Sequence, residues 1–77
     1  MSMFDRVKKV LVTNLQIYEK DIKHEAELVN DLGINSLELA DLVLICEEEF
    51  EIEIDDSSIR NFVTVGDVVT YLEGLVK

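Results

Sequence analysis

The chain has 77 residues, of which 17 are Asp or Glu and only 7 are Lys or Arg, so its formal net charge is −10. A domain of this length buries about 60% of its unfolded surface, too little to enclose a deep catalytic pocket, and we expect no enzymatic activity. The excess of acids argues against nucleic-acid binding, and 48% apolar residues argue against a disordered acidic tail. We therefore predict one folded domain, residues 1–77, that binds basic partners.

The single cysteine, Cys46, cannot form an internal disulfide, which favours a reducing, cytoplasmic compartment. The longest uninterrupted apolar run, residues 42–46, falls far short of the roughly 20 residues of a membrane-spanning helix. The N-terminal residues also lack an apolar signal core. We expect a soluble, monomeric protein that does not insert into membranes.

Apolar residues at helical spacing predict a first helix of about 15 residues that begins at Phe4. Its core stripe comprises Val7, Leu11, Leu15 and Tyr18. A loop of about residues 19–34 follows, which is longer than most connections in compact domains and must be held by buried side chains. The expected anchors are Leu28, Leu32 and Ile34.

The second predicted helix has the clearest start. Asn35 is suited to the N-cap position, Ser36 takes the first helical position, and Glu38 follows three residues after the cap. One side of this helix forms a core face of Leu39, Leu42, Val43, Cys46 and Phe50. The opposite side combines Leu37, Ala40 and Leu44 with Asp41 and Glu48. Apolar residues ringed by acids indicate a docking face, although single exposed leucines are also ordinary on protein surfaces.

The last third of the chain predicts two further helices. The alternation in residues 52–54 is too short for a stable strand, so we expect a connection into a short helical turn near residues 57–61. Thr64, with Asp67 three residues later, is typical of an N-cap. The stripe after it comprises Val65, Val68, Val69, Leu72, Leu75 and Val76. The predicted fold is all-α, a small antiparallel four-helix bundle with three longer helices and a short third one.

Ser36 is the only chemically suggestive group. The single histidine, His24, lies in the polar part of the loop, and nothing indicates that it activates the Ser36 hydroxyl as a nucleophile. The start of a helix suits an attached phosphate, because free backbone N–H groups and the helix dipole stabilise negative charge there. The alternative from the residues alone is that Ser36 merely helps to cap the helix.

Two other features predict no site. The acids at residues 47–49 lack the spaced oxygen ligands and central glycine of an EF-hand loop, so we expect no dedicated metal site. Cys46, on an apolar helical face, is interpreted as a small buried hydrophobic residue rather than a reactive thiol.

Three segments together resemble acyl carrier proteins: residues 31–38 (DLGINSLE), 47–50 (EEEF) and 54–56 (IDD). The resemblance extends over essentially the whole chain, from the first helix and long loop to a last helix after a Thr-Val pair. It implies that Ser36 carries a 4′-phosphopantetheine arm, transferred from coenzyme A by a separate phosphopantetheinyl transferase. The arm would hold acyl groups as thioesters and deliver them to fatty acid or related biosynthetic enzymes with basic surfaces.

The resemblance also implies roles for other residues. Those matching partner-docking positions are Asn35, Leu37, Glu38, Asp41, Leu44, Glu47, Glu48, Ile54 and Asp56. Those that would line a cavity for the acyl chain are Leu39, Val43, Cys46, Phe50, Ile54, Ile59 and Phe62, although ordinary core packing explains each of them equally well.

The chain departs from the family at Asn35, where an aspartate usually precedes the modified serine. Asn caps a helix as well as Asp does, but the missing charge bears on recognition by a transferase. Two alternatives to a fatty acyl carrier stay open. One is a specialised carrier of polyketide, aminoacyl or other starter units, and the other is an acidic interaction module with an unmodified Ser36.

Overall fold

The computed structural model describes residues 2–76, which form four α-helices. These are α1 (Met3–Leu15), α2 (Ser36–Phe50), α3 (Asp56–Ile59) and α4 (Val65–Leu75), with a short 3-10 turn at Glu19–Asp21 between α1 and α2. The described residues contain no strand, only an isolated bridge between Glu27 and Thr64. The predicted all-α class with three longer helices and a short third one is confirmed.

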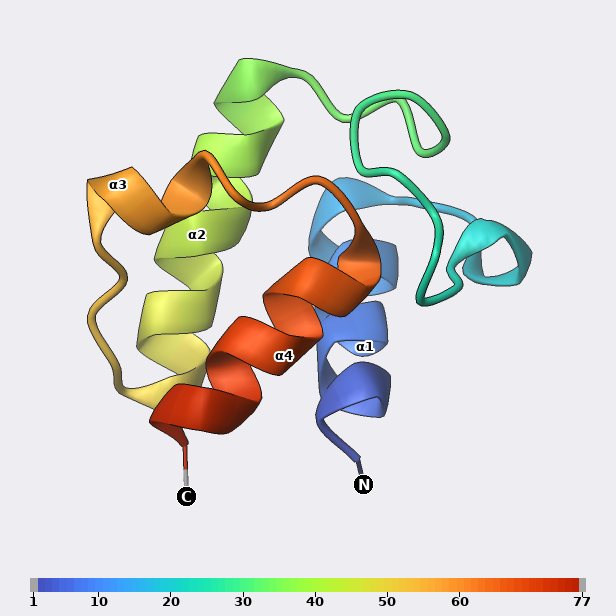
Figure 1. Ribbon diagram of the computed structural model, residues 1–77. Helices are drawn as coiled ribbons and strands as arrows, with labels where there is room; N and C mark the ends of the chain where they lie inside the picture. The colour runs from blue at the N-terminus through green and yellow to red at the C-terminus, as the bar shows by residue number, and fades with distance from the viewer. Residues whose placement is uncertain (1, 77) are drawn as a thin grey trace.

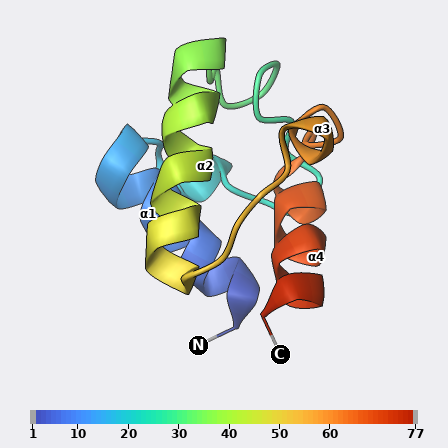
Figure 2. The same ribbon diagram turned by 90° about the vertical axis from the view of Figure 1, so that its left-hand side faces the viewer.

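The helix α1 contacts both of the other long helices, α2 and α4. It starts at the end of the molecule that holds both chain termini, and α2 runs back from the opposite end, as Figures 1 and 2 show. The start of α2 is therefore far from the termini. The buried side chains from these three helices and the loops form one core: Val7, Val10, Leu11, Ile22, Ala26, Leu28, Ile34, Leu42, Val43, Cys46, Phe50, Ile54, Phe62, Val65, Val68, Val69 and Leu72.

The first helix ends earlier than its stripe predicts. Gln16 adopts a left-handed conformation with φ of 56°, and the N–H groups of Gln16 and Ile17 both donate to the Leu11 carbonyl. This C-cap satisfies a free carbonyl of the last turn and turns the chain away. Tyr18, expected on the core stripe, is consequently 77% exposed, and that prediction is wrong.

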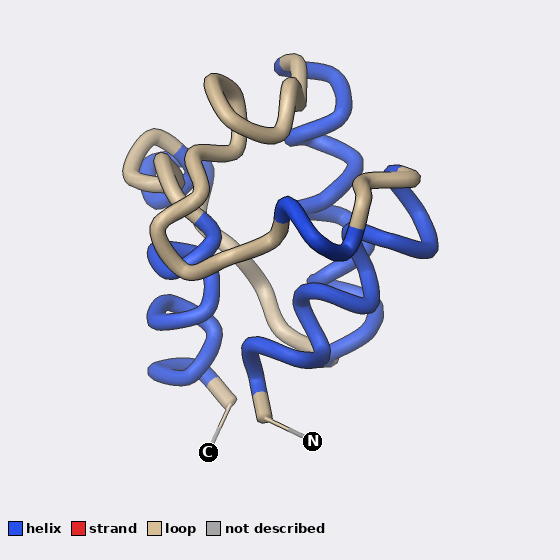
Figure 3. The backbone as a smooth tube through the Cα atoms, turned by 90° about the vertical axis from the view of Figure 1, so that its right-hand side faces the viewer, coloured by secondary structure: helices blue, strands red, loops and turns tan. Residues whose placement is uncertain are grey.

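The long loop is held by more side chains than the sequence indicated. Leu28 and Ile34 are buried and Leu32 is half-buried, as expected, but Ile22 and Ala26 are also buried. The backbone adds further attachments, since the Leu28 N–H donates to the Val63 carbonyl at 2.8 Å. Figure 3 shows the loops gathered mainly in the half of the molecule away from the termini.

The segment between α2 and α4 also differs slightly from expectation. The short helix occupies Asp56–Ile59 rather than residues 57–61, and a turn carries the chain on, with the Phe62 N–H donating to the Ile59 carbonyl at 3.1 Å. Thr64 caps α4 as predicted, because its side chain accepts from the Asp67 N–H and the Asp67 carboxylate accepts from the Thr64 N–H.

Among the described residues, no helix is long and apolar enough to cross a membrane.

Candidate functional site

Ser36 is exposed and is the first residue of α2. Gly33, with φ of +70°, turns the chain just before it, a conformation that glycine adopts without strain. The predicted N-cap at Asn35 is confirmed as a complete capping box: the Glu38 N–H donates to Asn35 Oδ1 at 2.8 Å, and the Asn35 N–H donates to Glu38 Oε1 at 3.1 Å. The serine therefore lies at a fully capped helix start.

The N-terminal turn of α2 can accept a negative group. In residues 2–76, the N–H groups of Ser36 and Leu37 make no hydrogen bond to another segment. Such free first-turn amides and the positive end of the helix dipole stabilise an attached phosphate. A phosphodiester on the Ser36 oxygen fits this environment, because the hydroxyl is open to solvent and the adjacent amides are available.

The predicted outer face of α2 is exposed as expected. Leu37 is 77% and Leu44 is 58% exposed, and Ala40, Asp41 and Glu48 are exposed beside them. Within the described chain none of these acids forms an ion pair, since the one salt bridge there joins Lys8 to Glu19 at 3.4 Å. Asp56, at the start of α3, is also exposed.

Three of the residues matched to docking positions make contacts within the protein instead. Glu38 closes the capping box, and the Glu47 carboxylate accepts the Ile54 N–H at 2.8 Å. Ile54 itself is only 8% exposed, because the loop after α2 folds its side chain into the core. An apolar surface contact at Ile54, as the docking list implies, is therefore not present, and Leu37 and Leu44 remain as the exposed apolar positions.

The residues matched to an acyl cavity lie in or beside the core. Val43, Cys46, Phe50, Ile54 and Phe62 are buried, whereas Leu39 and Ile59 are half-buried. Burial raises the pKa of the Cys46 thiol to about 12, and the carboxylates of Glu49 and Glu47 add to this effect. Because the thiolate is the nucleophilic form, Cys46 is unreactive at neutral pH, as its interpretation as a buried hydrophobic residue requires.

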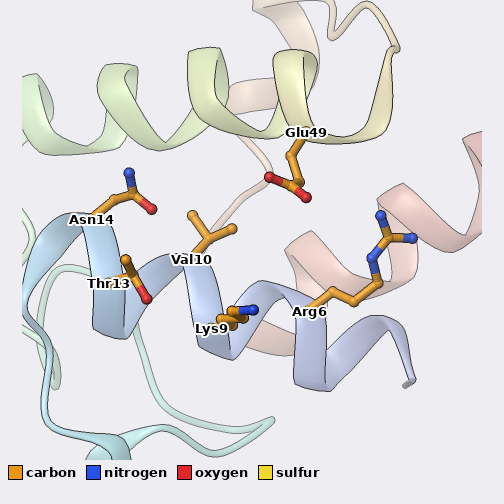
Figure 4. A pocket seen from close by; sticks show the side chains of 6 residues that line it. All are labelled: Arg6, Lys9, Val10, Thr13, Asn14 and Glu49. Atoms are coloured by element: carbon orange, nitrogen blue, oxygen red, sulfur yellow. The ribbon is translucent and has the colours of Figure 1, made fainter.

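A separate pocket of about 230 Å³ lies between α1 and α2, as Figure 4 shows. Its lining residues are Arg6, Lys9, Val10, Thr13, Asn14 and Glu49. None of the residues matched to docking or to the acyl cavity contributes to it. His24 is exposed as expected, but its ring also stacks on Phe4 with centroids 4.5 Å apart, a contact that the sequence did not reveal.

The fold is a small helical bundle with an exposed serine at the capped start of α2. Comparison with known proteins agrees. The family model described as "Phosphopantetheine attachment site" matches residues 5–72. Proteins named acyl carrier protein are similar over the whole chain: that of Campylobacter fetus is 42% identical and that of Campylobacter lari 44%, each over 77 residues and the full length of both proteins.

A relative from another organism gives the same result. The acyl carrier protein of Thermotoga maritima is 41% identical over 71 residues, which cover 92% of this chain and 88% of the relative. The chain belongs to the acyl carrier protein family, in which 4′-phosphopantetheine is the covalently attached cofactor. Acyl carrier function follows from that membership and implies contact with acyl chains and with acyl-processing enzymes.

Proposed function

We propose that Ser36 is the residue that carries the 4′-phosphopantetheine arm, and that the arm delivers thioester-bound acyl groups to fatty acid or related biosynthetic enzymes. The observation that supports this best is the exposed Ser36 hydroxyl at the capped start of α2, with free amides beside it. The cofactor supplies the thiol that forms the thioester. The chain itself contributes the attachment point and the surface that partners recognise.

The docking surface in this proposal consists of Leu37, Asp41, Leu44, Glu48 and Asp56, all exposed in the structure. Exposed acids attract basic partners over a distance and raise the association rate, while two exposed leucines give a small apolar contact. A small interface also releases quickly, which a carrier that visits several enzymes needs. The first such partner is the phosphopantetheinyl transferase that loads Ser36.

Intact-mass spectrometry after co-expression with a transferase tests the attachment site. We expect the mass of one phosphopantetheine group to be added to the wild-type protein and to Ser57→Ala, but not to Ser36→Ala. Ser57 is the matched control, because it is also an exposed helical serine, in α3. Addition to Ser36→Ala, or no addition to the wild type with any transferase, would falsify the proposal.

A double charge reversal tests the docking surface. Asp41→Lys with Glu48→Lys should slow loading by a transferase about tenfold or more at low salt, because electrostatic steering commonly changes association rates by about 10- to 1,000-fold. The control is Glu25→Lys with Glu73→Lys, which changes the net charge equally at exposed positions outside the surface. Equal loading rates for the two double variants would place docking elsewhere.

The cargo is tested separately. We expect the acyl groups released from the native, loaded protein to be fatty acyl chains. Recovery of polyketide, aminoacyl or other starter units instead would identify a specialised carrier while leaving the attachment at Ser36 intact.

A further inference from the structure

The helix α3 is held in place from outside itself. None of its residues is buried, and its N-cap residue, Asp55, makes no side-chain capping hydrogen bond. The chain on either side supplies the anchors, since Ile54 before the helix and Phe62 after it are buried in the core. Residues 54–62 therefore form a strap that is anchored in the core at both ends, with the half-buried Ile59 packing against the core between them.

One residue fastens the first end of this strap. The backbone carbonyl of Glu47 accepts the N–H groups of Glu51 and Ile52, which closes the end of α2. The Glu47 carboxylate then accepts the Ile54 N–H at 2.8 Å in a partly buried position. A hydrogen bond to a charged acceptor is about twice as strong as one between neutral groups. Glu47 thus accepts hydrogen bonds from three backbone amides, those of Glu51, Ile52 and Ile54, as the chain leaves α2.

The core residues next to the strap are buried. Val43 and Cys46 of α2 and the anchors Ile54 and Phe62 are all at most 8% exposed. Protein interiors are close-packed, so an additional apolar chain enters such a region only when a wall moves. The strap, whose helix contributes no buried residue, is one such wall, and moving Ile54 outward breaks the hydrogen bond to Glu47.

We propose that Glu47 is a latch: its carboxylate holds Ile54 and the strap against α2, and breaking this hydrogen bond is part of the cost of admitting an acyl chain between α2 and the strap. Glu47 acts here as a positioning residue and not through its charge on a partner. The closed state contains the hydrogen bond and the open state does not. Deleting the bond therefore shifts the equilibrium toward the open state by the differential stability that it provides. The admission of cargo rests on the proposed arm at Ser36, whereas the latch itself does not.

Amide hydrogen exchange on the unmodified protein tests the latch. In Glu47→Ala we expect the Ile54 amide to exchange about tenfold faster, or more, relative to the Leu72 amide, which reports global unfolding. In Glu47→Gln the exchange should stay much closer to that of the wild type, since a glutamine side chain still offers an oxygen acceptor. A role of Glu47 through charge alone would make the two variants equal, and that result would overturn the latch.

Glu48 provides the matched control. The Glu48 carboxylate accepts no hydrogen bond from a backbone N–H in the described chain, and the residue is exposed at the next position of α2. Glu48→Ala removes the same charge and the same side-chain atoms, so we expect no selective change at the Ile54 amide. If the exchange rate of the Ile54 amide rose as much in Glu48→Ala as in Glu47→Ala, the assignment of the latch to Glu47 would be contradicted.

The effect on cargo is measured with a pantetheine arm ending in a solvatochromic naphthyl group, loaded on Ser36. We expect Glu47→Ala to increase the fraction of blue-shifted, buried probe at least twofold, with Glu47→Gln between it and the wild type. Equal spectra in the loaded wild type and Glu47→Ala would overturn the role in cargo admission. A failure to load Ser36 at all would instead overturn the proposed function, and the exchange experiment on the unmodified protein would still decide the latch.

Discussion

The helices α2 and α4 begin with the same local device but differ in what surrounds it. Each has a capping box, Asn35 with Glu38 in α2 and Thr64 with Asp67 in α4. The first residue of α4, Val65, is 0% exposed, and its N–H donates to the Ala26 carbonyl at 3.0 Å. The first residue of α2, Ser36, is exposed.

The second residues of the two helices differ in the same way. The Gly66 N–H of α4 donates to the His24 carbonyl at 2.8 Å, so the long loop covers this helix start. The corresponding residue of α2, Leu37, is 77% exposed. The comparison teaches that an N-terminal dipole and a cap do not make a site by themselves. The free amides of α2 are available because no loop carbonyl occupies them.

The largest expected effect concerns the buried and exposed leucines of the two helices. Leu72→Ala in α4 should lower the free energy of unfolding by about 2–5 kcal/mol, because Leu72 is completely buried and its truncation leaves a cavity. Leu37→Ala in α2 should change it by less than about 0.5 kcal/mol and instead slow loading of the arm. Urea denaturation measures both, and a similar loss of stability in the two variants would remove the distinction.

The next prediction concerns Gly66, at the start of α4, where the long loop packs closely against the helix. A Cβ at Gly66 would lie 3.0 Å from the His24 carbonyl oxygen and 3.4 Å from its Nδ1. Gly66→Ala should therefore destabilise the protein by about 1–3 kcal/mol, since the backbone of the loop must shift. Gly74→Ala, in the same helix with no atom within 4 Å of the new Cβ, should stabilise it by about 0.5–1 kcal/mol. Thermal unfolding of both variants checks the opposite signs.

The two caps should be similar in stability and different in function. Asn35→Ala and Thr64→Ala should each cost about 1 kcal/mol, because each leaves a first-turn amide without its acceptor. Only Asn35→Ala should also slow modification of Ser36, since this cap orders the turn that carries the hydroxyl. Loading rates that fall equally in the two variants, at conditions where both are folded, would show that local order at α2 is unimportant.

The smallest effect is a pH dependence at α4. The pKa of the Asp67 carboxyl lies below its ordinary value of 3.8, chiefly because the Thr64 N–H donates to it at 3.0 Å. A lowered pKa in the folded state adds stability above the unfolded pKa and loses it as the pH falls through the folded value. Asp67→Asn should therefore flatten the stability profile below about pH 4, as measured by urea denaturation, and leave its shape near neutral pH unchanged.

The elements of the fold differ in how well the sequence predicts them. The two caps and most of the core stripes of α2 and α4 are local patterns that the structure confirms, but Leu75, expected on the α4 stripe, is 44% exposed. The end of α1 was predicted too late, because the left-handed turn at Gln16 has no glycine to signal it. The stacking of His24 on Phe4 and the burial of Ile22 and Ala26 join residues far apart in the chain, so no local pattern contains them.

The sequence by itself determined that this chain is acidic and all-α, that α2 starts at Ser36, and that Leu37 and Leu44 face away from the core. These properties follow from residue order, since helical periodicity and capping act within a few residues. Only the tertiary structure decided which helix start stays open and that Glu47 binds Ile54 instead of facing a partner freely. Those outcomes depend on where the loops return, because a carbonyl or an amide from a distant segment either reaches a site or leaves it free.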